Sequence, residues 1–434
     1  MELSEHPLRR ELVREMHLRR FAQVTAPARI IQTVLLVQDE ERQAEAEQLD
    51  AIAKRHGVEL HPDTRHAALT LGDGSAFLWE RHTEATTLTV ITGPDVDDET
   101  HGAASLLEEF PGMVVRATRI VVEPDEKSAL QRLAEMGFHE EDLVCCDINA
   151  GVTIWSDFGI REDGFGRLLL TSGTAGPSEL GRIIQRIQEL GNYRNLALLG
   201  LPTVRRLMPT LTDLEAKLAF YSSELGAEEG ESDEELMCDL SALSAELARL
   251  RVESSYRLSA SRAYSQIAMD RLAALSIAPR EGYQDLAEFT ERRLVPGMRT
   301  CETFVDRLRR LSERTGEAIA LLNTRIDTRI KAQNLGLLRS MESSFNLQLR
   351  LQNLVEALSV VAASYYAVGL IAYIIKGAKA FPDGNRTDII LAIVAPIVML
   401  AMLFVLSRLR HRVIRETETA LDSFDKSDVA GKLD

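Results

Sequence analysis

Hydrophobic and polar positions alternate with a short period in the first 200 residues, which is typical of a mixed α/β domain. The apolar runs predict strands at residues 30–37, 68–71, 76–79, 87–91, 113–122, 152–155 and 168–171. Helical patterns between them predict helices at residues 39–56, 127–136 and 178–190. The turn at Gly72-Asp73-Gly74 is typical of a hairpin, so we expect a partly antiparallel sheet.

A helical pattern dominates the chain after residue 200. Residues 201–295 predict an antiparallel helical pair, interrupted by an acidic stretch at residues 226–235 that we expect to be an exposed loop. Residues 296–375 predict one long helix, because Pro296 suits a first helical turn and no further proline follows before residue 375. Apolar or small residues recur along its first part at steps of three and four, at Phe304, Leu308, Leu311, Thr315, Ala318 and Leu322. This spacing predicts a seam packed against partner helices.

Two uncharged stretches, at residues 358–375 and 389–406, predict a hairpin of membrane spans. Each has about 18 residues, close to the roughly 20 that a helix needs to cross the hydrocarbon layer. A loop at residues 376–388 joins them, and a tail at residues 407–434 begins with Arg408, Arg410 and Arg412. Because basic residues favour the cytoplasmic side, we expect both chain ends in the cytoplasm.

Polar and small residues form one stripe along the long helix and through the first span. Its members are Gln348, Gln352, Glu356, Ser359, Ala363, Tyr366, Leu370 and Tyr373. Such a face in a membrane seeks either water or another helix, and the spacing leaves both open. In the first case several copies line a pore with Gln352, Glu356, Ser359, Ala363, Tyr366 and Tyr373. Glu356 would then be its main charged group, unless it pairs with Arg350 or a neighbouring helix.

Charge is distributed unevenly over the 434 residues, which carry a formal net charge of −16. Residues 1–291 hold 29 basic and 51 acidic residues, whereas residues 292–350 hold 12 basic and 6 acidic residues. An acidic head therefore precedes a basic stalk. The negative charge of the head is explained either by attraction between head and stalk or by a solvated acidic surface. The acidic balance argues against nucleic acid as a partner. The mean hydropathy of −0.08 averages this charged body with the apolar hairpin.

The chain shows few signs of catalytic chemistry. The Gly-rich segment at residues 171–182 lacks a P-loop lysine, so we interpret it as a tight strand-to-helix turn. His61 and His66 have no third ligand nearby, and the four cysteines lack zinc spacing. The vicinal pair Cys145-Cys146 is typical of a buried strand end. We therefore expect no enzyme, no certain cofactor and no metal site that the sequence can place.

Several segments resemble an uncharacterised bacterial family of predicted membrane-anchored proteins. The resemblance begins with a His-Pro-x-Arg and Glu-x-His-x-Arg opening, formed here by His6, Pro7, Arg9, Glu15, His17, Arg19 and Phe21. It continues at residues 192–202, 321–341 and 347–373 and spans nearly the whole chain. The resemblance implies a bacterial inner-membrane protein but no established activity.

The architecture also resembles the CorA-type divalent-cation channels, which are homopentamers whose first span lines the pore. That resemblance implies an α+β cytoplasmic head, a long helical stalk and a two-span transmembrane α-hairpin. It also implies a divalent cation as the ligand and a basic inner collar, here at Arg408, Arg410 and Arg412. The family's Gly-Met-Asn signature is replaced by residues 366–370, and Lys376 and Lys379 at the outer mouth would oppose cations.

Two functions follow from the sequence. The first is a homo-oligomer in the lipid bilayer, a pentamer by resemblance, which passes an ion or small solute along the first span. The second is a membrane-anchored scaffold or sensor, in which the spans only tether and oligomerise the protein and the head binds a partner or ligand.

Overall fold

The computed structural model describes residues 5–10, 12–13, 22–61, 64–94, 103–226, 232–377, 392–405 and 408. The chain divides into two units, Met1–Leu322 and Asn323–Asp434. One helix, α8 (Leu286–Gly377), begins in the first unit and continues into the second.

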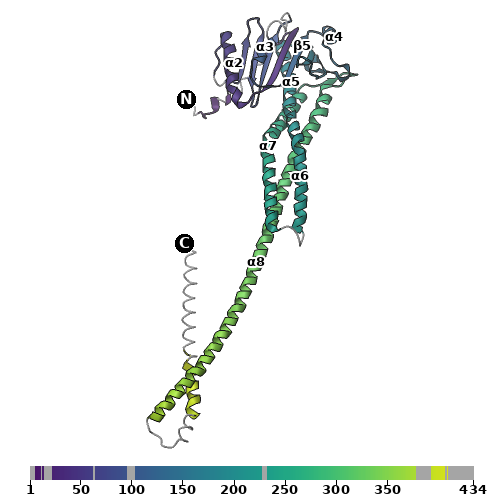
Figure 1. Cartoon of the computed structure of the whole chain (residues 1–434). Helices are drawn as coiled ribbons and strands as arrows, with labels where there is room; N and C mark the ends of the chain where they lie inside the picture. The colour runs from purple at the N-terminus through teal and green to yellow at the C-terminus, as the bar shows by residue number, and fades with distance from the viewer. Residues whose placement is uncertain are drawn as a thin grey trace. The chain divides into compact units, whose positions relative to one another are not determined.

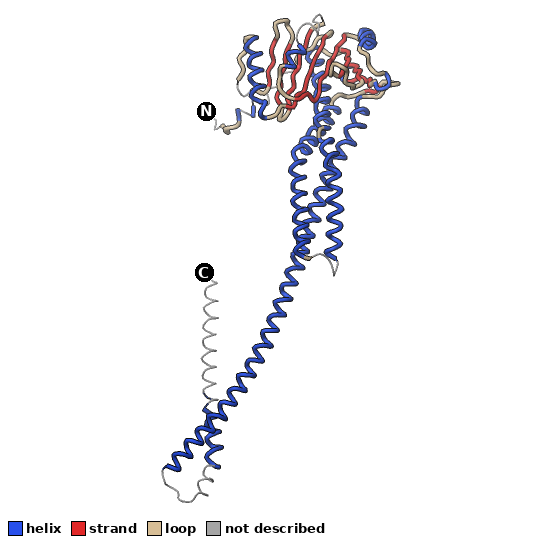
Figure 2. The backbone as a smooth tube through the Cα atoms, in the orientation of Figure 1, coloured by secondary structure: helices blue, strands red, loops and turns tan. Residues whose placement is uncertain are grey.

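A mixed sheet forms the centre of the first unit (Figures 1 and 2). Its described strands are β1 (Ala28–Leu36), β2 (His66–Thr70), β3 (Ala76–Arg81), β4 (Ala85–Thr92), β5 (Met113–Glu123), β6 (Val144–Ile148), β7 (Val152–Ser156), β8 (Gly166–Thr171) and β9 (Ala278–Pro279). They lie in the order β2-β3-β4-β1-β5-β8-β7-β6-β9. Strands β5 and β8 pair in parallel and the other neighbours pair antiparallel, which confirms the expected partly antiparallel sheet.

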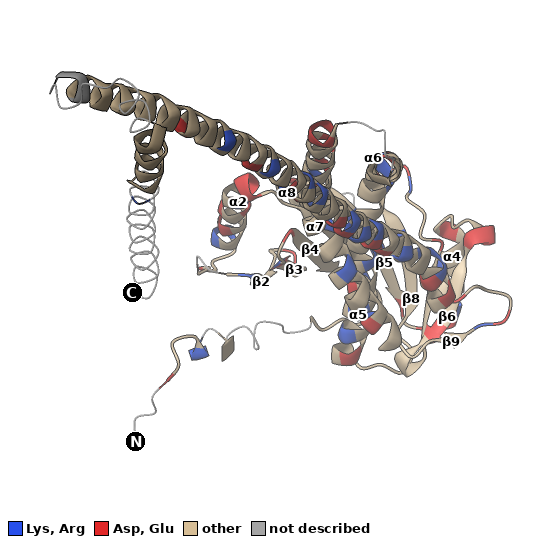
Figure 3. Cartoon of the chain, turned by 90° about the horizontal axis from the view of Figure 1, so that it is seen from below, with Lys and Arg blue, Asp and Glu red and all other residues tan. Residues whose placement is uncertain are grey.

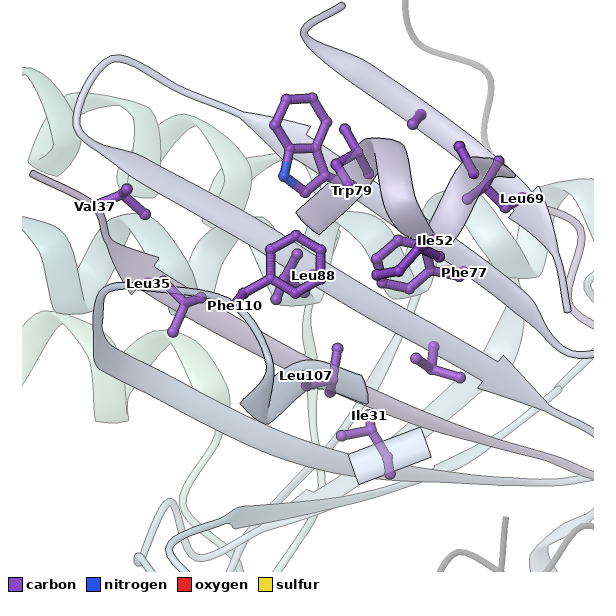
Figure 4. Packing of buried hydrophobic residues seen from close by; sticks show 14 residues of the cluster. Ile31, Leu35, Val37, Ile52, Leu69, Phe77, Trp79, Leu88, Leu107 and Phe110 are labelled. Carbon is purple, nitrogen blue, oxygen red and sulfur yellow. The ribbon is translucent and has the colours of Figure 1, made fainter. Parts of the chain in front are cut away.

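Apolar side chains on one face of β1–β4 form the larger core cluster (Figure 4). Phe77, Trp79 and Leu88 are fully buried there, and Ile52 reaches them from helix α2 (Arg42–Arg55). Phe110, after helix α3 (Ala103–Glu108), stacks on Phe77 with ring centroids 6.1 Å apart. Burying each large apolar side chain contributes about 1.5–3 kcal/mol, so this cluster holds α2 and α3 to the sheet.

Helix α4 (Glu126–Glu135) covers the other half of the sheet with a second cluster around Trp155 and Leu169. The alternate side chains of the strands face helix α5 (Pro177–Leu198), because successive strand residues point to opposite faces. Ile30 and Val34 of β1 lie on this face, whereas Ile31 belongs to the larger cluster. Figure 1 shows α5 lying against the sheet.

Three long helices extend from the side of the sheet that α5 covers (Figures 1 and 2). These are α6 (Gly200–Gly226), α7 (Asp233–Ala273) and the first part of α8. All residues of the predicted α8 seam from Phe304 to Leu322 are buried. α7 contributes its own row of leucines at steps of three and four, namely Leu236, Leu240, Leu243, Leu247 and Leu250. Arg307 of α8 fastens α6 through two hydrogen bonds to the Glu215 carboxylate, at 3.0 and 2.6 Å.

The predicted start of the long helix at Pro296 is wrong, because α8 begins ten residues earlier at Leu286. Pro296 lies inside the helix, where it removes one backbone donor. The residues on either side explain why the helix continues: Leu286, Leu294 and Met298 are buried and extend the same seam. Their burial offsets the cost of the interior proline.

The acidic stretch at residues 226–235 is not wholly a loop, because α7 begins at Asp233. The Ser232 hydroxyl accepts a hydrogen bond from the Glu235 N–H at 3.2 Å, and the Glu235 carboxylate accepts one from the Ser232 N–H at 3.3 Å. This capping box, with acidic residues in the first turn, stabilises the positive end of the helix. Strand β6 was not among the predicted strands, although it contains the Cys145-Cys146 pair expected to be buried.

The second unit contains α8 beyond Leu322 and a short apolar helix at Ala392–Val405. From residue 323 to 374 nearly every described side chain of α8 is exposed or partly exposed. Residues 357–375 carry no charge, and Figure 3 shows this end of α8 in tan.

Candidate functional site

The predicted polar stripe lies on α8 in the second unit, and its side chains are accessible. Tyr366 and Tyr373 are 75% and 80% exposed. Gln352 and Ser359 are exposed, and Glu356 and Ala363 are partly exposed. All six candidate pore residues therefore lie on one helix, at the spacing that the sequence predicts.

The Ser359 hydroxyl already has an acceptor within its own helix. It donates a hydrogen bond to the Val355 carbonyl at 2.8 Å, which satisfies a polar group on an otherwise apolar segment. The rings of Tyr365 and Tyr366 are in edge-to-face contact, with their centroids 5.9 Å apart. The bond to Val355 lets the Ser359 hydroxyl lie in an apolar environment.

Two buried residues mark a different face of the same segment. Val360 and Ser364 are each 5% exposed, and they lie about a third of a turn around the helix from Ser359 and Ala363. The short helix at Ala392–Val405 lies beside this part of α8 in two perpendicular views (Figures 1 and 3). The stripe is thus left uncovered by the described residues of the same chain.

The charged residues expected at the two mouths are only partly described. Lys376 lies in the last turn of α8, and Arg408 is exposed. Lys379, Arg410 and Arg412 lie outside the described residues.

One described helix, α8, contains a window long and apolar enough to cross a membrane, with a mean hydropathy of 1.8. The described part of the second predicted span, Ala392–Val405, is apolar but shorter than a span. By length and composition alone this is weak support for a membrane protein, and the two-span hairpin stays a prediction.

No group of three or more His, Cys, Asp or Glu side chains within the described ranges could hold a metal ion. The Gly-rich segment before α5 forms the expected tight turn: Gly173 has a φ of 55°, and the Thr174 N–H donates to the Ala150 carbonyl at 2.8 Å. The segment therefore positions the start of α5.

A cavity against β5 was not predicted from the sequence. Arg116 lines it and is only 7% exposed. Its Nη1 donates to amide oxygens of Asn192, Gln32 and Gln188 at 2.8, 3.2 and 3.4 Å. Burial, and then the charge of Arg194, lower the pKa of Arg116 to about 9. A signal was present in the sequence, because an arginine at an inward-facing position of an alternating strand is costly without a partner.

The sequence pattern of a family described as proteins of unknown function, DUF3422, matches residues 4–413. The chain belongs to that family. No curated protein matches this chain.

Proposed function

We propose that this protein is a membrane-anchored homo-oligomer of the inner membrane, in which copies of α8 assemble and their polar stripes form a path for an ion or small solute. The CorA-type architecture that the sequence resembles suggests five copies and cytoplasmic chain ends. The proposal concerns the second unit and assigns no catalytic role to the head.

The observation that carries the proposal is the exposed apolar surface of α8 beyond Leu322. Leu354, Leu358 and Tyr366 are 66%, 67% and 75% exposed, and they belong to a row of such residues that begins near Ile330. Leaving one large apolar side chain in water forgoes about 1.5–3 kcal/mol, and soluble monomers rarely expose long contiguous patches. Either lipid or further copies of the chain could remove this apolar surface from water.

The positions of the buried residues support a stripe that faces other copies. The face with Val360 and Ser364 is covered, and the face with Ser359, Tyr366 and Tyr373 is not. If Ala392–Val405 is part of a second span against the covered face, the stripe is free to meet its counterparts around an axis. Polar side chains in a bilayer are then hydrated or bonded between helices.

Cysteine cross-linking tests whether copies of the stripe meet. The parent would carry Cys238→Ser, since Cys238 is the exposed cysteine and Cys145, Cys146 and Cys301 are buried. We expect Ser359→Cys to form disulfide-linked dimers in membranes under mild oxidation. The matched control Val361→Cys lies on the opposite side of α8 and should remain monomeric. Equal cross-linking at both positions, or none at residue 359, would refute the assembly.

Flux into liposomes tests whether the stripe conducts. Purified protein would be reconstituted and the flux of Mg²⁺, Zn²⁺, protons and chloride measured. We expect flux of at least one species, with a tenfold or larger change in Glu356→Gln. Glu317→Gln, at an exposed acidic position of α8 within the first unit, is the control and should behave as the parent. No flux of any species would remove the conduction part of the proposal.

The second candidate is a membrane-anchored scaffold or sensor. It is favoured by Lys376 at the end of α8 and by Lys379 in the loop that the sequence predicts, because a ring of such lysines would oppose cations. The two experiments separate the candidates: a scaffold gives stripe cross-links without flux.

A further inference from the structure

A cavity of about 310 Å³ lies in the first unit between β5, β8, the segment after β7 and helix α5. Arg116 and Thr118 line it from β5, Phe158 from the segment after β7, and Arg194 and Asn195 from α5. Ile160, also on its lining, is 79% exposed, so the cavity is open to solvent at that side. The volume is near the lower end of small-molecule sites.

Three arginines and no described carboxylate line this cavity, and one of the three, Arg167, is paired with Asp163 at 3.8 Å. Arg194 lies against a stacked pair of aromatic rings, with its guanidinium carbon 4.7 Å from the Phe158 centroid and 5.5 Å from the Phe289 centroid. Arg293, which is outside the cavity lining, lies over the same pair, with its guanidinium carbon 4.0 Å from the Phe289 centroid. Within the described part of the chain, neither Arg116 nor Arg194 forms an ion pair.

The positive charge of one of these arginines lowers the pKa of the next. Burial, and then the charge of Arg293, lower the pKa of Arg194 to about 10, and the charge of Arg194 in turn lowers that of Arg116. Both remain protonated near pH 7. Several like charges at one partly desolvated place destabilise the empty protein, and a bound anion would remove this cost.

Hydrogen-bond donors without acceptors also favour an anion in this cavity. The three acceptors of Arg116 among the described residues are all bonded to Nη1, which leaves Nε and Nη2 available. Thr118 is 5% exposed, and its hydroxyl has no partner among the described residues. Buried polar groups normally have partners, so unmatched donors beside a cavity suit the acceptor oxygens of a ligand.

We propose that this cavity binds a small organic acid, with its carboxylate or phosphate group held between Arg116 and Arg194. A planar guanidinium binds either group through two parallel hydrogen bonds. Phe158, Ile160 and Leu168 give the rest of the lining an apolar part, beside the polar residues Ser156, Arg167 and Asn195. The ligand therefore combines one acidic group with a compact apolar or aromatic body.

The binding test uses the full chain in detergent and two acidic probes with the same ring, phenyl phosphate and benzoate. Inorganic phosphate serves as the probe without a ring, and sodium chloride at equal ionic strength controls for screening. Binding would be followed by thermal unfolding, using the fluorescence of Trp79 and Trp155, which are both buried in the first unit. We expect one of the ring-bearing acids to raise Tm by several degrees in a saturable manner. The ranking of the two probes distinguishes a phosphate site from a carboxylate site.

Three variants test the assignment of residues. Arg194→Leu removes one of the like charges, so it should fold at least as well as the parent and bind the acid at least tenfold more weakly. Arg116→Met should abolish the shift, and the Arg194 variant decides the question if Arg116→Met is unfolded. Arg182→Leu, an exposed arginine of the same helix outside the cavity, should bind as the parent does.

The proposal is overturned if no acid stabilises the parent more than sodium chloride. It is equally overturned if Arg194→Leu keeps the parental affinity or if Arg182→Leu loses it. None of these outcomes depends on membrane assembly or flux, so this site and the proposed role of α8 fail independently.

Discussion

Replacing Gly191 by alanine probes how tightly α5 packs on the buried arginine. A Cβ at residue 191 would lie 2.7 Å from Cζ, Nε and Nη2 of Arg116, well inside normal contact distance. The guanidinium cannot move away freely, since Nη1 is bonded to Asn192 at 2.8 Å, to Gln32 at 3.2 Å and to Gln188. Relief of the clash must break at least one of these hydrogen bonds.

The magnitude follows from two opposing effects. A hydrogen bond to a charged group is worth about 1.5–3 kcal/mol, and one or two would be lost in Gly191→Ala. Alanine in place of a helical glycine returns up to about 1 kcal/mol. We therefore expect a net destabilisation of about 0.5–6 kcal/mol. Gly316→Ala is the matched control, because no heavy atom lies within 4 Å of its added Cβ, and it should stabilise by up to about 1 kcal/mol.

Urea unfolding of the full chain in detergent provides the assay, because Trp79 and Trp155, the two tryptophans of the chain, report the head. The penalty of Gly191→Ala should largely disappear in an Arg116→Met background, where the guanidinium is gone. Two results would refute the reasoning: a Gly191→Ala variant stabilised like Gly316→Ala, or an equal penalty with and without Arg116.

Three further predictions concern packing, pH and thiols. Phe304→Ala, at a fully buried seam position of α8, should cost about 3–5 kcal/mol in the same unfolding assay; a loss below 1 kcal/mol would contradict the packing of α6, α7 and α8. A hydrogen bond from Arg307, together with its charge, lowers the pKa of Glu215 below its ordinary 4.5. The Arg307–Glu215 pair therefore stabilises the protein above pH 4.5, and this effect is lost as the pH falls through the folded pKa of Glu215. Because the pair is partly exposed, Glu215→Gln should lower the free energy of unfolding by under about 1 kcal/mol at pH 7, and variant and parent should be equally stable in acid. In a thiol titration of the native protein at pH 8, we expect Cys238 alone to react quickly, since the other three cysteines are buried and burial raises the pKa of Cys145 to about 12; fast reaction of a second thiol would count against this packing.

Sequence patterns located most strands of the head, because alternation between two chemically different faces is a local property. The run predicted at residues 113–122 is strand β5, Met113–Glu123, and the run at 76–79 is β3, Ala76–Arg81. Strand β6 was missed because it is short and four of its five residues are buried, so it lacks alternation. The order of the strands could not be predicted, since it depends on pairings between segments far apart in the chain.

The start of α8 was misplaced for a related reason. Pro296 is a local signal for a helix start, but the buried residues Leu286 and Leu294 before it outweigh that signal. The arginine cavity depends on the register of α5 over β5, which places Gly191 against Arg116. No local pattern encodes that register. The polar stripe of α8, by contrast, follows directly from helical periodicity.

The sheet of the head is completed by residues that lie beyond two long helices in the sequence. Strand β9 pairs with β6, and the Cys145 N–H donates to the Gln284 carbonyl at 3.0 Å. Phe289 then stacks on Phe158 with ring centroids 4.4 Å apart. During synthesis, the edge of β6 thus stays unpaired until more than a hundred further residues have been made and β9 emerges.

This delay also fixes the order of events on the ribosome. At about 5–20 residues per second, the roughly 40 residues between Phe289 and the exposed apolar row that begins near Ile330 take about 2–8 s to make. Sheet-rich domains commonly fold within milliseconds to seconds. The head therefore has time to close its last strand before the apolar part of α8 emerges, which keeps an unfinished sheet edge and a nascent hydrophobic helix from being exposed together.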